Sequence, residues 1–246
     1  MRSTSRLHRS ALIAERVAEN ARTVTLQLDC SLTCEPGQFA MIWLPGVDEK
    51  PFSISADNPL CFTIARVGPF SEALHALRPG DRLWFRGPFG TGYHAGAGST
   101  LLVGGGYGAA PLHFLARRLV AATPPAHVEA VLGARTAADL LFPARFADLG
   151  VEVHAATEDG SAGLRGLATD AACALLESGR FDRVCACGPE AMLERLASLC
   201  RERGVPAELS YEAYMRCGIG LCGSCEHAGR LVCMDGPVFT VPAPSL

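Results

Sequence analysis

Short apolar segments rich in β-type residues alternate with turn residues over the first third of the chain. Only one stretch with helical spacing, Ser71–Leu77, interrupts them. This pattern is typical of a small antiparallel barrel, in which short strands follow one another through turns. The expected strands are residues 10–17, 22–28, 38–44, 51–55, 60–66 and 81–87. We therefore predict an N-terminal β-barrel domain over residues 1–97.

The pattern changes after the glycine-rich stretch Gly87–Thr100, which indicates a loop and a domain boundary. Beyond it, apolar strands alternate with helical segments, as in right-handed βαβ units with a mostly parallel sheet. We therefore predict a Rossmann-like α/β domain over residues 98–210. Its expected strands are 101–105, 127–134, 151–157, 183–188 and 206–212, with helices at 110–122, within 166–178 and at 189–204. Residues 211–246 have little periodicity and form a predicted third domain, which cannot build a core alone.

Charge and hydropathy exclude two classes of protein. The chain has 22 basic and 25 acidic residues, a net charge of −3, and lacks the basic stripe of nucleic-acid-binding proteins. No uninterrupted apolar stretch approaches the roughly 18 residues that span a bilayer. We expect a soluble protein without nucleic-acid or membrane partners. The arginine-containing start lacks the apolar region of a secretory signal, and we interpret it as a leader before the first strand rather than a transit peptide.

The chain has eleven cysteines, a high and odd number. Secreted disulfide scaffolds are usually short and even in cysteine count, so a reducing, cytoplasmic location fits better. Seven cysteines are scattered, whereas four lie close together near the C-terminus. In a reducing compartment, such clustered thiols usually bind a metal or take part in chemistry.

The four clustered cysteines have the spacing C-x4-C-x2-C-x7-C. The ligands would be Cys217, Cys222, Cys225 and Cys233. The first three spacings match the plant-type [2Fe–2S] loop, and the intervening glycines allow a backbone that wraps closely around a cluster. A structural zinc site also takes four thiolates, but it normally pairs them as two separated C-x2-C units. The spacing favours an iron–sulfur cluster, with zinc and disulfides as alternatives.

Two barrel segments are candidates for holding a flavin dinucleotide. Lys50-Pro51-Phe52-Ser53 begins an expected strand, and Gly68-Pro69-Phe70-Ser71 opens the helix. The amides at a helix start attract phosphate, and Ser71 would cap this helix. A cation and a hydroxyl close to such a helix start would suit a pyrophosphate. Lys50 is the single lysine among 22 basic residues, so the arginine-rich composition of the chain does not account for it. The loop with Gly90 and Thr91 would close over the nucleotide, or serve as a linker.

Three strand ends in the α/β half are candidates for a nicotinamide nucleotide. Glycines after the first strand of this half, at Gly104, Gly106 and Gly108, lead into a helix, as in dinucleotide-binding turns. Asp159 and Gly160 lie in a later turn at the carboxyl edge of the sheet. Cys187-Gly188-Pro189 joins another strand to a helix, and Cys187 would flank the nicotinamide or pack in the core. Tight turns and solvated loops are the structural alternatives. No paired-carboxylate or Ser–His–Asp arrangement indicates hydrolase chemistry.

The order of these motifs resembles the ferredoxin–NADP reductase superfamily and, within it, the electron-transfer subunits of class B dihydroorotate dehydrogenase. The motifs are KPFSI, VGPFS, GPFGTGY, GGGYGAAPL, EDGSAGLRG, CGPEAM and CGIGLCGSC followed by CMDGPVF. The similarity runs from about Ser10 to Phe239. Many flavoenzymes share the reductase motifs, so the narrower family rests on the cysteine segment ending in DGPVF.

The resemblance implies FAD in the barrel, NAD in the α/β half and a [2Fe–2S] cluster in the C-terminal loop. It also implies a partner catalytic subunit that carries FMN and oxidises dihydroorotate in pyrimidine synthesis, in a heterotetramer of two copies of each chain. Lys50, Pro51, Phe52 and Ser53 stand where the family has an R-P-x-S flavin motif, with lysine replacing arginine. Ser71 stands at the position of a small hydroxyl residue near the pyrophosphate.

An electron-transfer function is chemically coherent. Nicotinamide exchanges a hydride and an iron–sulfur cluster takes single electrons, so the flavin has to lie between them. Alternatives are a reductase subunit of a hydrogenase or of an NADH-dependent ferredoxin reductase, and a zinc-stabilised nucleotide-binding scaffold. Monooxygenase reductases carry a longer ferredoxin domain. The resemblance favours NAD, although Arg135 suits a 2′-phosphate.

Overall fold

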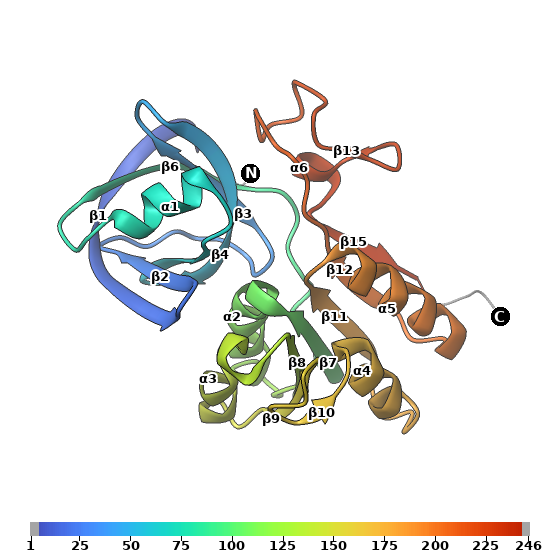
Figure 1. Cartoon of the computed structure of the whole chain (residues 1–246). Helices are drawn as coiled ribbons and strands as arrows, with labels where there is room; N and C mark the ends of the chain where they lie inside the picture. The colour runs from blue at the N-terminus through green and yellow to red at the C-terminus, as the bar shows by residue number, and fades with distance from the viewer. Residues whose placement is uncertain (1–4, 243–246) are drawn as a thin grey trace. The chain divides into compact units, whose positions relative to one another are not determined.

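The first six strands close into an antiparallel barrel in the order β1-β2-β5-β4-β3-β6, in a computed structural model that describes residues 5–242 (Figure 1). Their bounds are β1 Ser5–Asn20, β2 Thr23–Leu28, β3 Phe39–Leu44, β4 Asp48–Asp57, β5 Leu60–Ala65 and β6 Arg82–Phe89. Large apolar side chains from different strands, Ile54, Phe62 and Phe85, are buried. The predicted barrel is confirmed, and its closure pairs β1 with β6, so that no strand edge is left open.

The barrel's helix α1 spans Pro69–Ala76, two residues earlier at its start than expected. Proline at the first helical position has the right φ and loses no intrahelical hydrogen bond, which explains the early start. Phe70 and Leu74 lie one turn apart on the same side of the helix, and both are buried. Their burial fixes the face of α1 that packs against the barrel.

The second half forms a seven-stranded sheet in the order β10-β9-β8-β7-β11-β12-β15, parallel except for β15. The strands are β7 Ser99–Gly105, β8 His127–Ala134, β9 Glu152–Thr157, β10 Leu164–Arg165, β11 Arg183–Cys187, β12 Ala207–Ser210 and β15 Val238–Val241. The helices are α2 Ala109–Val120, α3 Pro143–Asp148, α4 Ala168–Leu176 and α5 Glu190–Arg203, with short 3-10 turns at Gly106–Gly108 and Ala137–Asp139. The predicted Rossmann-like domain is therefore confirmed.

Two apolar cores flank this sheet. On one face, Leu112 of α2 and Phe146 of α3 pack with Leu102. On the other face, Ala172 of α4 and Leu196 of α5 pack with other apolar residues. Because successive strand residues point to opposite faces, each central strand contributes to both cores.

Three elements of this half were not expected from the sequence pattern. The helix α3 has six residues and β10 has two, too few to establish a periodicity. The edge strand β15 pairs antiparallel with β12, with Ser210 opposite Val238. Its pairing depends on a strand some thirty positions earlier, so local sequence gives little indication of it.

Contacts divide the described chain into two packing units. Residues 5–92 group with Ala213–Pro237, and Tyr93–Glu212 group with residues 238–242. The cysteine-rich segment lacks an apolar core and packs with the barrel, while β15 joins the sheet. These boundaries differ from the predicted domain boundaries of 1–97, 98–210 and 211–246. That each predicted domain holds one cofactor stays a prediction.

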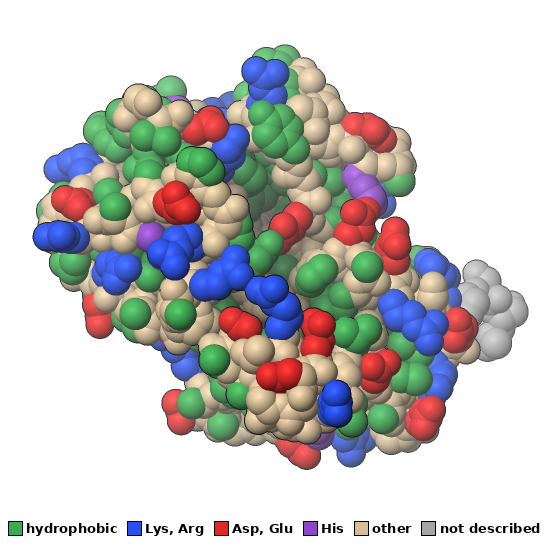
Figure 2. All heavy atoms as spheres, in the orientation of Figure 1, with side chains coloured by type: hydrophobic (Ala, Val, Ile, Leu, Met, Phe, Trp, Pro, Cys, Tyr) green, Lys and Arg blue, Asp and Glu red, His purple; other side chains and the backbone are tan. Residues whose placement is uncertain are grey.

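The cysteine-rich segment contains little regular structure. A two-residue hairpin, β13 Glu226–His227 with β14 Arg230–Leu231, precedes the one-turn helix α6 Val232–Asp235. No helix in the described part of the chain is long and apolar enough to cross a membrane. Acidic and basic side chains are interspersed on the face drawn in Figure 2, in keeping with the nearly balanced charge of the sequence.

Candidate functional site: the cysteine segment and the two nucleotide sites

Backbone amides in the cysteine segment point toward its sulfur atoms. The Cys217 Sγ accepts hydrogen bonds from the backbone N–H groups of Ile219, Leu221 and Cys222, at N–S distances of 3.5, 3.3 and 3.4 Å. The Cys233 Sγ accepts one from Gly220 at 3.2 Å. Amides that surround thiolates in this way stabilise their negative charge and are a feature of iron–sulfur loops.

The four thiols differ in burial and in acidity. Cys225 and Cys233 are buried, whereas Cys222 is exposed with its Sγ 3.0 Å from the Ser224 hydroxyl. Hydrogen bonds with the side chains and backbone of Ser224 and Cys217 lower the pKa of Cys222 to about 6. Burial and the neighbouring Cys225 raise the pKa of Cys233 to about 12. Metal binding at the buried thiols would require their deprotonation.

The spacing and surroundings of the thiols bear on the two metals considered. A structural zinc site normally pairs its four thiolates as two separated C-x2-C units. Here three cysteines fall within nine residues, and backbone amides point at their sulfurs. The donor set therefore fits a [2Fe–2S] cluster, which divides its four thiolates between two irons, better than a single zinc.

The cysteine segment is fixed to the barrel at three places. A Cβ on Gly218, whose φ is +68°, would lie 2.9 Å from Cγ of the buried Met41 on β3. The Thr91 amide donates to the Gly236 carbonyl over 2.6 Å. The Lys50 Nζ lies 5.2 Å from the centre of the Tyr214 ring. These contacts place the segment beside the strand that precedes the lysine motif.

The candidate flavin residues come together in the barrel. The Phe52 ring of β4 stacks on Phe70 of α1, with centroids 6.0 Å apart and planes at 27°, so the two motifs are neighbours. A Cβ on Gly68 would meet no atom within 4 Å, which leaves the helix start accessible to a ligand. The Lys50 ammonium pairs with Asp48 at 2.7 Å, and its side chain is 31% exposed. This lysine is the third residue of β4, near the start of the strand as expected.

The expectation that Ser71 is the N-cap residue of α1 was wrong, but its hydroxyl does accept a hydrogen bond from the N-cap amide. Gly68 is the N-cap residue, and Ser71 is the third residue of the helix. The Ser71 hydroxyl accepts hydrogen bonds from the amides of Val67 and Gly68 and donates to the Gly68 carbonyl. Because Pro69 starts the helix early, Ser71 stabilises the loop that presents the helix start.

Gly90 and Thr91 contact the end of the cysteine segment. A Cβ on Gly90, whose φ is +75°, would lie 2.6 Å from the Gly236 carbonyl oxygen. The Gly90 carbonyl accepts a hydrogen bond from Gln38 Nε2 at 2.8 Å. These backbones thus hold the end of the cysteine segment against the barrel, and their predicted contact with a nucleotide stays a prediction.

The glycine turn after β7 packs against the Cys187-Gly188-Pro189 turn. A Cβ on Gly108 would lie 2.1 Å from the Cys187 carbonyl oxygen, and one on Gly188 would lie 3.0 Å from the Gly105 Cα. Gly106 differs, because it has a φ of +54° and open space where a Cβ would be. The structure thus brings two of the three predicted nucleotide segments together, with Gly104 close to the start of α2.

The third segment, with Asp159 and Gly160, bonds to the loop after β8. The Asp159 amide donates to the Arg135 carbonyl, and the Ser161 hydroxyl accepts from the Ala137 amide. The Ser161 hydroxyl and amide lower the pKa of the exposed Asp159. This turn lies at the carboxyl edge of the sheet, as expected, and its conformation is fixed by its own hydrogen bonds.

Cys187 is buried at the end of β11, and burial raises its pKa to about 12, so the thiol is neutral. Sequence reasoning missed two of its neighbours. The Tyr107 hydroxyl donates to Glu212 Oε2 at 3.2 Å, and burial raises the pKa of Glu212. Glu212 lies two residues beyond the end of β12, at the carboxyl edge of the sheet, which is the sequence signal that would have found it.

Comparisons with known proteins agree with this geometry. Residues 212–242 match the family described as the iron-sulfur cluster binding domain of dihydroorotate dehydrogenase B, and residues 102–197 match the oxidoreductase NAD-binding domain. A structure titled as an NADH-dependent reduced ferredoxin-NADP oxidoreductase is 29% identical, with a TM-score of 0.84, and the match covers 94% of this chain and 87% of that chain.

Two relatives are named "Probable dihydroorotate dehydrogenase B (NAD(+)), electron transfer subunit". The relative from Methanocaldococcus jannaschii is 40% identical, over 92% of this chain and 87% of its own. The relative from Methanopyrus kandleri is 43% identical, over 93% and 88%. The fold and the matched domains define an NAD-dependent oxidoreductase with an iron–sulfur domain. More narrowly, the chain belongs to the family of dihydroorotate dehydrogenase B electron-transfer subunits, as the resemblance predicted.

Proposed function

We propose that this chain carries electrons between NAD and a partner subunit that holds FMN and oxidises dihydroorotate in pyrimidine synthesis. FAD in the barrel and a [2Fe–2S] cluster in the cysteine segment form the route. One observation carries the proposal: the four cysteines and the candidate flavin residues share a packing unit, with Tyr214 over Lys50 and Gly218 against Met41. The relatives' name supports the partner.

Each set of residues has a proposed role in holding a cofactor. The cluster is held by Cys217, Cys222, Cys225 and Cys233. FAD is held by Lys50, Pro51, Phe52, Ser53, Gly68 and Ser71, with Gly90 and Thr91 shaping the adjoining backbone. NAD is held by Gly104, Gly106, Gly108, Asp159, Gly160, Cys187, Gly188 and Pro189. The charge of Lys50 offsets that of a phosphate without the two-pronged hydrogen bonding of arginine.

The bound cofactors supply the chemistry, since a flavin exchanges electrons singly or in pairs and so connects a hydride donor to a one-electron centre. The protein positions them and controls charge. Amides around Cys217 offset thiolate charge, and burial keeps Cys187 a neutral thiol. Neither role requires a side chain to transfer a proton, in keeping with the lack of a catalytic acid–base pair in the sequence.

An anaerobic visible spectrum of the purified protein, with iron, zinc and flavin quantified before and after NADH, tests the proposal. We expect flavin bands and about two irons per chain, with bleaching by NADH. A colourless protein with one zinc, which also resists reconstitution with iron, sulfide and FAD, would instead support the scaffold alternative.

The partner requires a separate test. Leu221, beside the exposed Cys222, is 82% exposed, and a cluster near the surface needs a docking face that excludes water. We expect coelution with the FMN subunit at the mass of two copies of each chain. A persistent monomer in the presence of that subunit would contradict the predicted heterotetramer. A cytoplasmic location belongs to this proposal, and the high, odd number of cysteines, unusual for a secreted disulfide scaffold, supports it.

A reductase subunit of a larger ferredoxin-linked complex is the second candidate. The observation that favours it is the TM-score of 0.84 with the NADH-dependent ferredoxin-NADP oxidoreductase, with coverage of 94% of this chain. The two candidates make different predictions for the reconstituted protein. Reduction of the FMN subunit by dihydroorotate followed by NAD reduction supports the first, whereas electron exchange with ferredoxin alone supports the second.

A further inference from the structure

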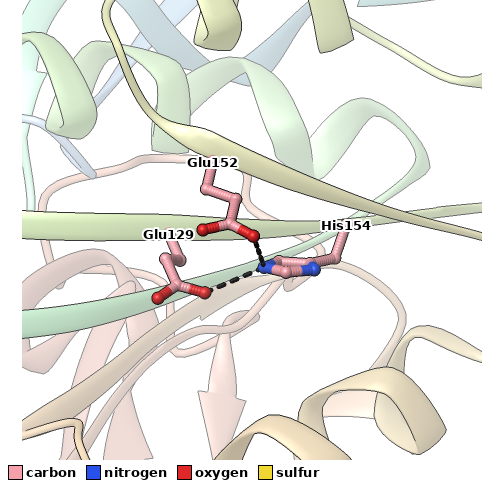
Figure 3. Close-up of side chains that lie close together, drawn as sticks. All are labelled: Glu129, Glu152 and His154. Carbon is pink, nitrogen blue, oxygen red and sulfur yellow. Dashed lines mark hydrogen bonds and ion pairs between the residues drawn. The ribbon is translucent and has the colours of Figure 1, made fainter.

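A charged cluster lies on the sheet away from the nucleotide turns. Glu129 and Glu152 are directly opposite on neighbouring parallel strands, β8 and β9, and His154 lies two positions beyond Glu152 on the same face. Figure 3 shows these three side chains converging, with the His154 Nε2 directed between the two carboxylates. The Nε2 is 2.8 Å from Glu129 Oε2 and 3.7 Å from Glu152 Oε1.

This arrangement needs positive charge. Like charges directly opposite each other on neighbouring strands repel, and the Glu129 side chain is only 1% exposed, so water screens it poorly. Arg180 donates to Glu129 Oε2 at 2.7 Å and His127 contacts Oε1 at 3.0 Å. With neutral imidazoles, two carboxylates and one guanidinium leave a net charge of −1. The cluster can therefore accept a further cation.

We propose that Glu129, Glu152 and His154 form a binding site for a divalent first-row transition metal of the zinc type. One imidazole nitrogen and two carboxylates form a donor set common to zinc and its neighbours. The three ligand atoms lie within 4.8 Å of one another. In a tetrahedral site, bonds of about 2.0–2.2 Å place two ligand atoms about 3.3–3.6 Å apart, so the three side chains would draw together to complete the site.

Neighbouring residues suit supporting roles. The metal takes the position of the proton now shared between His154 Nε2 and Glu129, and Arg180, with its side chain 46% exposed, keeps or shifts its bond to the carboxylate. His127 holds the other carboxylate oxygen and stacks on Phe181 at 6.5 Å between centroids. Hydrogen bonds of this kind to a ligand carboxylate orient it toward a metal. Glu152 is 67% exposed, which leaves an entry path from solvent.

The site sits near the amino ends of β8 and β9, whereas the nucleotide turns follow the carboxyl ends of the strands. The metal would thus join two neighbouring strands without taking part in electron transfer. Because it binds only the folded sheet, it stabilises the fold by an amount that grows with the logarithm of 1 + [Zn²⁺]/Kd. This inference is independent of the proposed function.

Equilibrium dialysis of the flavin- and iron-loaded protein against Zn²⁺, with metal analysis and a thermal melt, tests the site. We expect one zinc per chain with the iron content unchanged, and a Tm that rises with zinc. His154→Gln and Glu152→Gln should each weaken binding at least about 100-fold, more than loss of a supporting residue does. In both variants zinc should no longer raise the Tm, even if the substitution itself changes the Tm of the metal-free protein.

His127→Gln is the matched control, because it changes the neighbouring histidine, keeps a hydrogen-bond donor to Glu129 and removes none of the three ligands. It should lower zinc affinity by no more than about tenfold. The assignment fails if the unaltered chain takes up no zinc beyond the cysteine segment. It fails equally if His127→Gln abolishes uptake while His154→Gln retains it, or if zinc replaces iron instead of adding to it.

Discussion

The thiols of Cys222 and Cys187 belong to the same residue type and have opposite properties. Cys222 lies in an exposed loop whose hydroxyl and amide donors lower its pKa to about 6. Cys187 ends a buried strand, and burial raises its pKa to about 12. Burial and hydrogen bonding therefore set the acidity of each thiol, but acidity alone does not mark a ligand. Cys233 is also buried, with a pKa raised to about 12, and differs from Cys187 in lying among the clustered cysteines.

The largest expected effect is on the iron content of variants at these two cysteines. Cys222→Ala should lower the iron content from about two per chain to nearly none, because a four-thiolate cluster loses a ligand. Cys187→Ala should keep the iron and the flavin, because its thiol binds neither. Iron and sulfide analysis with the visible spectrum measures both. Loss of iron from Cys187→Ala with its flavin retained would contradict the division of roles.

The next effect concerns the turn that buries Cys187. Gly108→Ala would place a Cβ 2.1 Å from the Cys187 carbonyl oxygen. We expect a loss of about 3 kcal/mol in the free energy of unfolding, the upper end for overpacking, with weaker NADH binding. Gly106→Ala is the control, since its Cβ meets open space and only its φ of +54° costs about 1 kcal/mol. Urea unfolding of both variants compares them, and equal losses would refute the steric explanation.

Ser224→Ala should change the reduction potential of the cluster through the exposed Cys222 thiol. Its hydroxyl lies 3.0 Å from the Cys222 Sγ, and donation to a thiolate favours the more negative, reduced cluster. Loss of about 1 kcal/mol of that preference lowers the one-electron reduction potential by on the order of 50 mV. A redox titration followed by electron paramagnetic resonance measures the shift. Ser178→Ala, at an exposed helix end, should leave the potential unchanged, and a shift there would point to a nonspecific effect.

The smallest effect concerns Glu212, which raises the pKa of Cys187. Burial raises the pKa of Glu212 above its unfolded value, so its contribution to stability is full at acidic pH and is lost as the pH rises through the folded pKa. Glu212→Gln removes that loss. The free energy of unfolding of the variant, relative to that of the unaltered chain, should therefore be slightly higher at pH 8 than at pH 4. Thermal melts at both values test this, and an opposite pH trend would contradict it.

The sequence predicts this fold well where the relevant pattern is local. The alternating strands of the barrel and the spacing of Cys217, Cys222 and Cys225 each occupy a few consecutive residues, and both predictions agree with the structure and the matched families. The glycines after β7 belong to the same class, because a strand, a turn and a helix follow one another directly.

The rest depends on contacts between distant parts of the chain. Tyr107 bonds Glu212 across 105 positions, and Glu129 faces Glu152 only because β8 and β9 pair in one register. A shift of that register by one residue would turn the carboxylates to opposite faces, and no local pattern fixes it. The error at Ser71 was a boundary error, since a helix that starts at Pro69 moves this residue from the N-cap to the third helical position, from which its hydroxyl accepts from the N-cap amide.

The chain passes between its two packing units at residues 92–93, 212–213 and 237–238, and this has a consequence for protein engineering. The iron–sulfur segment is an internal insert rather than a detachable tail, because β15 follows it and forms the edge of the sheet beside β12. Cutting the chain before Ala213 would remove β15 as well and expose the β12 edge to aggregation. An exchange of redox modules between relatives would therefore have to graft residues 213–237 at both ends and retain Val238–Val241.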